Sequence, residues 1–195
     1  MKLYTDYCDF LHERGLLRGT LTKAIKIWTG CGFAHLFDML QPKVILEIGR
    51  FDGHSLGLFR WLAPEAAIIS VEPSPRPHAK KVIDALWEHG LPGETIFIDK
   101  TSDEAFKDPG LLNLRYDFAL IDGDHSYEGA LRDWGNTKGV MAPNGVVAFD
   151  NTEMACGKVF DRIDDFKTVK PFHVNFRKDP ADGGQFGLVF MGDRP

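Results

Sequence analysis

Five short apolar runs recur along the chain and constrain its fold more than any other feature. Their residues follow one another without polar alternation, which is typical of strands buried on both faces of a parallel sheet. Amphipathic stretches between them supply the crossovers that parallel strands need. The expected strands are 43–49, 66–72, 94–99, 116–122 and 145–150, and the expected helices are 55–63, 75–90 and 126–141, with a short helical or irregular return over 101–113.

Turn signals set some of these boundaries. Ser74 with Pro75 is expected to supply the cap and the first-turn proline of the helix over 75–90. The turn Pro143-Asn144-Gly145 is expected to close the helix over 126–141. Pro42 is expected to stop the helical pattern of the residues before it.

The C-terminal part of the chain departs from this rhythm. Residues 157–167 carry a helical apolar stripe. Apolar residues then alternate over 171–177 and 185–191, on either side of a loop at 178–184. These patterns predict a terminal pair of antiparallel strands.

The sequence therefore predicts an α/β fold with a doubly wound, Rossmann-like, mostly parallel sheet. A C-terminal antiparallel hairpin ends the sheet, and helices cover both faces. We expect a single domain over 1–195, in which 1–41 form an N-terminal helical cap and 42–195 form the core.

Composition and charge exclude several classes of protein. A net charge of −5 argues against a nucleic-acid binder, which would normally show a basic patch or stripe. The cysteines, Cys8, Cys31 and Cys156, have no CxxC spacing, so we expect no disulfide framework or zinc site. Asp6 and Asp9 interrupt the apolar core that a signal peptide needs, and no segment has the length of a membrane span. A cytoplasmic protein is the resulting expectation.

A glycine-containing loop follows the first expected strand. Glu47 is near the strand end, Gly49 and Gly53 lie in the turn, and Ser55 begins a helix. Glycines let a ligand approach the backbone, and a helix N-terminus offers N–H groups to a negative group. The alternative is that these glycines only make a tight turn. The loop lacks the G-x-G-x-x-G of a dinucleotide site, which disfavours a nicotinamide oxidoreductase.

Glu72 ends the second expected strand, 23 positions after Gly49. An acid in this place can accept hydrogen bonds from both hydroxyls of a ribose bound over the loop. The alternative is a turn-forming acid before Ser74. The combination with the glycine loop favours ribose binding.

Polar side chains also follow the fourth and fifth expected strands. Asp122, Asp150 and Asn151 lie at the carboxyl ends of strands that should be neighbours, where open α/β sheets bind ligands. Two carboxylates and an amide oxygen suit Mg²⁺ or a similar divalent cation. Each residue alone could instead make a turn or cap a helix.

Together these motifs resemble class I S-adenosylmethionine-dependent methyltransferases, closest to the catechol O-methyltransferase-like group and methyltransferase family 24. The similarity covers about 42–191 and implies a seven-stranded sheet with the last pair reversed. It also implies that Gly49, Phe51 and Ser55 line the cofactor, that Glu47 supports the loop, and that residues after the third strand lie beside the adenine. The expected cofactor-binding set is Glu47, Gly49, Phe51, Gly53, Ser55, Glu72, Thr101, Ser102 and Asp122.

The resemblance implies Asp122, Asp150 and Asn151 as metal ligands and places His125 where the family has its general base. A histidine at the start of a helix could instead bond a backbone carbonyl. We interpret Asp124 as a capping or orienting group.

These expectations give the hypothesis of a metal-dependent O-methyltransferase that acts on a hydroxyl of a small molecule. We expect no nucleic-acid or membrane partner, and a homo-oligomer is possible. The alternatives are a metal-independent small-molecule methyltransferase, a non-catalytic cofactor-binding accessory protein and a nicotinamide oxidoreductase.

Overall fold

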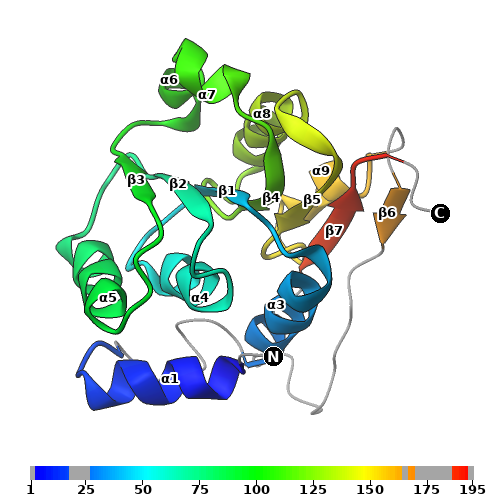
Figure 1. The fold of residues 1–195 in the computed structure, drawn as a ribbon. Helices are drawn as coiled ribbons and strands as arrows, with labels where there is room; N and C mark the ends of the chain where they lie inside the picture. Colours follow the sequence, from blue (N-terminus) through cyan, green and yellow to red (C-terminus); the bar gives the residue numbers. More distant parts are fainter. Residues whose placement is uncertain (1–2, 18–26, 164–166, 170–185, 193–195) are drawn as a thin grey trace.

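The structure, a computed structural model, is a sheet with helices on both faces (Figure 1). It describes residues 3–17, 27–163, 167–169 and 186–192. The seven strands are ordered β3-β2-β1-β4-β5-β7-β6. They are β1 Val44–Ile48, β2 Ala67–Val71, β3 Thr95–Ile98, β4 Tyr116–Ile121, β5 Met141–Phe149, β6 Lys167–Val169 and β7 Gly187–Phe190.

Neighbouring strands from β3 to β5 pair in parallel, and β7 pairs antiparallel with both β5 and β6. The order steps outward from β1 in both directions, so the sheet is doubly wound with a switch point between β1 and β4. The predicted mostly parallel α/β architecture with an antiparallel C-terminal end is confirmed.

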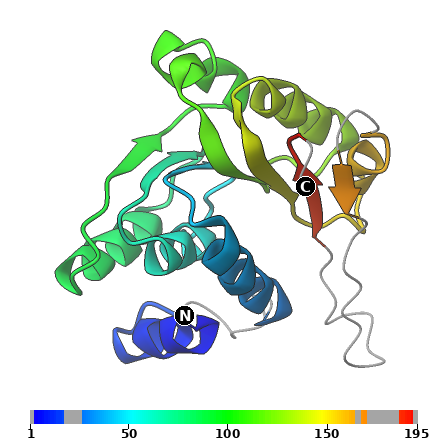
Figure 2. The same ribbon diagram turned by 45° about the vertical axis from the view of Figure 1, so that its right-hand side comes forward.

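Two groups of helices cover opposite faces of the sheet (Figure 2). One group is α1 Tyr4–Glu13, α3 Ile27–Leu40, α4 His54–Leu62 and α5 Pro77–Glu88, and the other is α6 Ser102–Ala105, α7 Pro109–Asn113, α8 Tyr127–Lys138 and α9 Gly157–Phe160. Each group buries its apolar side chains in a separate core against the central strands. Among the described helices, none has the length and hydropathy that crossing a bilayer requires.

The C-terminal elements differ from the sequence-based prediction. Helix α9 ends at Phe160, whereas a helix was expected over 157–167. Lys167 instead begins β6, because its backbone pairs with β7. The strand expected over 185–191 is confirmed as β7. The strand expected over 171–177 and the loop over 178–184 lie outside the described residues.

Two predicted boundaries are also wrong. Helix α5 begins at Pro77 with Arg76 as its N-cap, not at Pro75 with Ser74 as its cap. The backbone N–H of Ser74 instead donates to Glu72 Oε1 at 2.9 Å, which holds Ser74 in the preceding turn. Strand β5 begins at Met141, so Pro143-Asn144-Gly145 lies inside the strand. A register shift in the pairing with β4 accommodates these residues.

Candidate functional site

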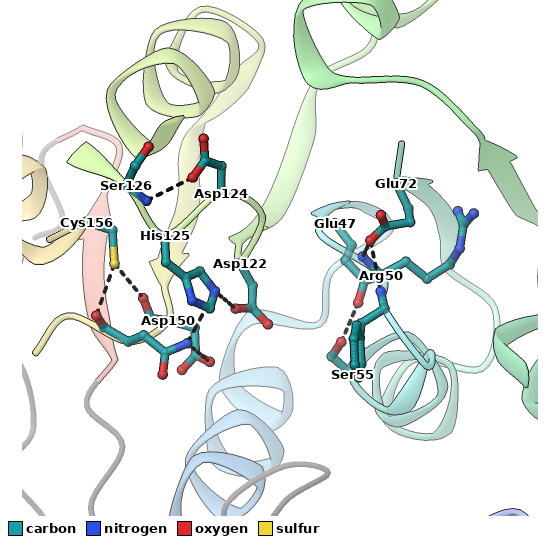
Figure 3. Close-up of polar contacts among 12 residues, drawn as sticks. Glu47, Arg50, Ser55, Glu72, Asp122, Asp124, His125, Ser126, Asp150 and Cys156 are labelled. Carbon is teal, nitrogen blue, oxygen red and sulfur yellow. Dashed lines mark hydrogen bonds and ion pairs between the residues drawn. The ribbon is translucent and has the colours of Figure 1, made fainter. Parts of the chain in front are cut away.

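The candidate residues meet because the carboxyl ends of β1, β4 and β5 are aligned. The backbone N–H of Asp122 donates to the carbonyl of Ile48 at 2.8 Å, and that of Asp150 donates to Ile121 at 3.1 Å. The first residues beyond these strands therefore lie side by side. Figure 3 shows the resulting groups, with Asp122, His125 and Asp150 in one and Glu47, Arg50, Ser55 and Glu72 in the other.

Gly49 allows the loop after β1 to contact the loop after β4. Its φ is +95°, and a Cβ there would lie 2.0 Å from the backbone carbonyl oxygen of Asp122. Gly53, with φ +81°, is the N-cap of α4, and a Cβ there would lie 2.6 Å from Cα of Ala79. The close approaches that these glycines permit are thus to the protein's own backbone, and no side chain fits at either position.

Glu72 holds the glycine loop in place. Its Oε2 accepts the backbone N–H groups of Arg50 at 3.1 Å and Phe51 at 3.0 Å, and its Oε1 accepts that of Ser74. A carboxylate has about four acceptor positions, so these bonds leave capacity for ligand hydroxyls. Phe51 itself has φ +43° and a largely exposed ring, over which the Arg76 guanidinium lies at 3.6 Å from the ring centroid.

Glu47 lies beneath this loop and is fully buried. Ser55 Oγ donates to its Oε1 at 2.6 Å, and Ser70 Oγ donates to its Oε2 at 2.5 Å. Burial raises the pKa of Glu47 to about 7, although both hydroxyl bonds oppose that shift. The carboxyl group orients Ser55 and does not itself line the pocket described below.

Asp122, His125, Asp150 and Asn151 form a strand-end cluster. His125 Nε2 lies 3.1 Å from Asp122 Oδ1 and 3.5 Å from Asn151 Nδ2, which donates to Asp150 Oδ2 at 3.1 Å. The carboxyl groups of Asp122 and Asp150 lie within hydrogen-bonding reach of each other. Burial raises the pKa of Asp122, and the hydrogen bond to Asp122 raises the pKa of His125.

The backbone around this cluster is fixed by short-range bonds. Asp124 Oδ1 accepts the N–H of Ser126 at 2.9 Å, and Ser126 Oγ caps α8 by accepting the N–H of Gly129 at 3.0 Å. Asp124 therefore orients the turn, as expected. Asn151 has φ +53°, which asparagine tolerates better than most residues, and Cys156 Sγ donates to its carbonyl at 3.0 Å.

A single pocket of about 640 Å³ joins the glycine loop to the strand-end cluster. That volume is in the range of small-molecule and cofactor sites. Every predicted site residue except Glu47 lines it: Gly49, Phe51, Gly53, Ser55, Glu72, Thr101, Ser102, Asp122, His125, Asp150 and Asn151. The hydroxyl of Thr101 is already used in a capping box with Glu104 at the start of α6.

The sequence-based prediction missed several charged residues of the pocket wall, among them Arg50 and Asp133. The Arg50 guanidinium is buried, donates to the carbonyl of Ser70 at 2.8 Å and pairs with Asp99 at 2.6 Å. No sequence pattern distinguishes it from an exposed loop arginine. Asp133 is buried on α8. The sequence could have indicated it, because a carboxylate stands there at the helical spacing of the inward-facing residues.

The strand-end side chains predicted to bind a cation are Asp122, Asp150 and Asn151. Within the described part of the chain, no group of three or more His, Cys, Asp or Glu side chains could hold a metal ion. The predicted set contains two carboxyl groups and one amide. Its chemistry suits a hard cation, and the two neighbouring carboxylates favour a positive charge or a proton between them.

Comparisons with known proteins agree with this architecture. The model of the Methyltransferase domain family matches residues 46–152. A search of curated proteins gave no match. A methyltransferase from Geobacter sulfurreducens superposes with a TM-score of 0.67 at 15% identity, covering 97% of this chain and 87% of that one.

Two further structures were solved with ligands. The O-methyltransferase TomG from Streptomyces achromogenes, in complex with SAM, has a TM-score of 0.63 at 15% identity and covers 97% of this chain and 89% of its own. An O-methyltransferase from Bacillus cereus, in complex with SAH, has a TM-score of 0.65 at 13% identity, with coverages of 96% and 90%. Likenesses at these identities show the shared fold.

Proposed function

The chain belongs to the Methyltransferase domain family and is an S-adenosylmethionine-dependent methyltransferase, and we propose that it methylates a hydroxyl oxygen of a small molecule. The observation that carries this proposal is the single pocket that adjoins both the glycine loop and the strand-end cluster. Structural neighbours bound to SAM or SAH support the choice of cofactor.

The glycine loop and Glu72 are proposed to hold the cofactor. Glu72 would accept hydrogen bonds from the ribose hydroxyls with the acceptor capacity left after it has fixed the loop. Ser55, oriented by Glu47, and the loop residues around Gly49 would hold the methionine part. The bound cofactor supplies a methyl group that is already activated by a sulfonium, so the protein's main task is alignment and exclusion of water.

His125 is proposed to act as the general base. The acceptor oxygen gains the methyl group, the carbon–sulfur bond breaks to leave a thioether, and the hydroxyl proton moves to Nδ1 of His125, the ring nitrogen that does not contact Asp122. Asp122 stabilises the imidazolium that forms, because its Oδ1 lies 3.1 Å from Nε2. The same contact orients the ring toward the pocket (Figure 3).

A divalent cation such as Mg²⁺ is proposed at Asp122, Asp150 and Asn151. It would lower the pKa of the acceptor hydroxyl. Asn151 would turn its amide oxygen toward the site, which needs only a half-turn of the amide group. Metal-independent transfer is the competing possibility, and chelation distinguishes the two.

Calorimetry with S-adenosylhomocysteine tests the cofactor assignment directly. We expect one molecule bound per chain and no binding of NAD⁺. Binding of NAD⁺ in place of S-adenosylhomocysteine would refute the proposal and support an oxidoreductase.

A screen of small hydroxylated acceptors then tests the reaction, with release of S-adenosylhomocysteine as the readout. With the best acceptor, His125→Ala should lower kcat about 10²- to 10⁴-fold, and His12→Ala, which changes an exposed histidine of α1, should not. A His125→Ala variant with full activity would eliminate the assigned base. If EDTA leaves the wild-type activity unchanged, the metal proposal is wrong.

A further inference from the structure

Asp133 is a buried carboxyl group that neither the glycine loop nor the strand-end cluster explains. It lies on the inward face of α8, between Ala130 and Trp134, and is 2% exposed. It nevertheless lines the pocket, together with Ser102 and Gly123. A buried carboxyl group is costly unless its oxygens have hydrogen-bond partners, so its position calls for a specific reason.

Only one half of this carboxyl group has a partner among the described residues. Ser102 Oγ donates to Oδ1 at 2.5 Å, and Ser102 begins α6, which packs against α8 (Figure 1). No described residue donates a hydrogen bond to the other oxygen, Oδ2. Burial raises the pKa of Asp133, and the bond from Ser102 opposes this shift.

Gly123 keeps Oδ2 uncovered on the side of the loop after β4. A Cβ at Gly123 would lie 3.1 Å from Oδ2, so a larger residue there would crowd that oxygen. Oδ2 thus lies between α8 and this loop, and Asp133 is part of the pocket wall. Oδ2 is therefore a hydrogen-bond acceptor that is held in position without a donor among the described residues.

Asp133 lies on the side of the pocket that is lined by residues after β3. Glu72 follows β2, and Thr101 and Ser102 follow the neighbouring strand β3. A ribose held at Glu72 can extend its base toward this side of the pocket. An adenine carries an exocyclic amino group, which needs an acceptor when it is buried.

We infer that Asp133 recognises the amino group of the cofactor's adenine through Oδ2, while Ser102 holds the carboxyl group in orientation. This inference rests on the proposed function. It assigns a specificity-determining role to a residue of α8. A 6-oxo base in the same position would place its oxygen against Oδ2, and the two acceptors would repel each other.

Calorimetry with S-adenosylhomocysteine and its 6-oxo analogue, S-inosylhomocysteine, tests the inference. The wild-type chain should prefer the adenine ligand about 10- to 100-fold, as expected for one hydrogen bond to a charged group. Asp133→Asn should bring the two affinities to within about threefold, since the amide can turn its NH₂ toward the 6-oxo group. Asp117→Asn changes a carboxylate that binds the N–H groups of Lys43 and Val44 and lies outside the pocket, and it should keep the wild-type preference.

The preference ratio separates recognition from a structural role. If Asp133 only anchors α6 to α8, Asp133→Asn weakens both ligands equally, and an unchanged ratio overturns the inference. A wild-type ratio within threefold of unity overturns it even if the variant does not fold. If neither ligand binds the wild-type chain, the proposed function fails and this inference fails with it. Binding of S-adenosylhomocysteine without a preference refutes the role of Asp133 alone.

Discussion

Glu47 couples two elements through one carboxyl group. Its oxygens accept hydrogen bonds from Ser55 at the start of α4 and from Ser70 on β2, and it is fully buried between them. Burial disfavours the charged form, which is why its pKa rises from 4.5 to about 7. Near neutral pH the side chain that orients Ser55 is therefore close to its own titration point.

The raised pKa of Glu47 makes the stability of the fold depend on pH. A carboxyl group with a higher pKa in the folded state binds its proton more tightly when folded, so its stabilising contribution is complete below about 4.5. The contribution is lost as the pH rises from 4.5 to about 7. The loss is of the order of 3 kcal/mol. We expect urea unfolding to show that the wild-type chain loses stability relative to Glu47→Gln across this window, and parallel pH profiles would contradict the assignment.

Gly49 is the position where a single added carbon should do most damage. Gly49→Ala would place a Cβ 2.0 Å from the carbonyl oxygen of Asp122, in a left-handed backbone conformation. Because the atoms that this Cβ would meet, in Asp122 and Gly123, belong to the backbone, they cannot move aside cheaply. We expect a loss of about 3 kcal/mol or more in urea unfolding, together with weaker binding of S-adenosylhomocysteine.

Gly135→Ala is the matched control for that change. Gly135 lies in the interior of α8, and a Cβ there meets nothing within 4 Å. Alanine should stabilise the helix by about 0.5–1 kcal/mol. Equal effects of the two substitutions would show that the close approach at Gly49 is not what constrains the loop.

At the scale of elements, Arg60 connects α4 to the amino ends of β2 and β3. Its guanidinium donates to the carbonyls of Ala66 at 2.7 Å and Glu94 at 2.5 Å, and to Thr95 Oγ1 at 3.0 Å. The side chain is fully buried, and burial lowers its pKa to about 10. These contacts lie at the edge of the sheet opposite the pocket.

Arg60→Met should therefore reduce stability without changing the site. Removal of the donors leaves several buried carbonyls unpaired, for which we expect a loss of about 3–5 kcal/mol in urea unfolding. Calorimetry below the unfolding transition should give an affinity for S-adenosylhomocysteine within about threefold of wild type. A large loss of affinity in folded protein would show that the two edges of the sheet are coupled.

The elements that the sequence predicted well are those with a strong local pattern. The buried parallel strands were predicted because their apolar runs are continuous. The common location of Asp122, Asp150 and Glu72 at one pocket was predicted because strand ends are where such sheets bind ligands. The start of α5 was missed because a tertiary bond from Ser74 to Glu72 outweighs a local cap signal. The boundary between α9 and β6 was missed because strand pairing with β7 determines it.

The predicted and the missed residues of the candidate site also differ in how local their signals are. Those on loops after strands were predictable from position alone. Arg50 and Asp133 were missed, since their significance depends on which way a side chain turns in the folded chain. Arg50 is buried against Asp99, 49 residues away, and Asp133 is bonded to Ser102, 31 residues away.

For the molecule as a whole, the apolar cores that stabilise the fold lie on the faces of the sheet, whereas the candidate site lies at the carboxyl ends of its strands. Both faces carry their own apolar core, and the carboxyl ends of the strands are left to the polar side chains that line the pocket. A ligand bound there contacts loops from several strands at once. Ligand binding should consequently stabilise the entire fold, because those loops are ordered only in the folded chain.

Thermal unfolding can separate the cofactor from the proposed cation. S-adenosylhomocysteine at about 100 times its Kd should add about 2.7 kcal/mol and raise Tm by roughly 5–10 °C. Mg²⁺ should add a further increase in the wild-type chain, because it would neutralise the neighbouring carboxyl groups of Asp122 and Asp150. Asp150→Ala should keep the shift from S-adenosylhomocysteine and lose the increment from Mg²⁺, whereas Asp161→Ala, which removes an exposed carboxylate after α9, should keep both. An increment from Mg²⁺ that survives Asp150→Ala would place the cation elsewhere, and no increment in the wild-type chain would favour transfer without a metal.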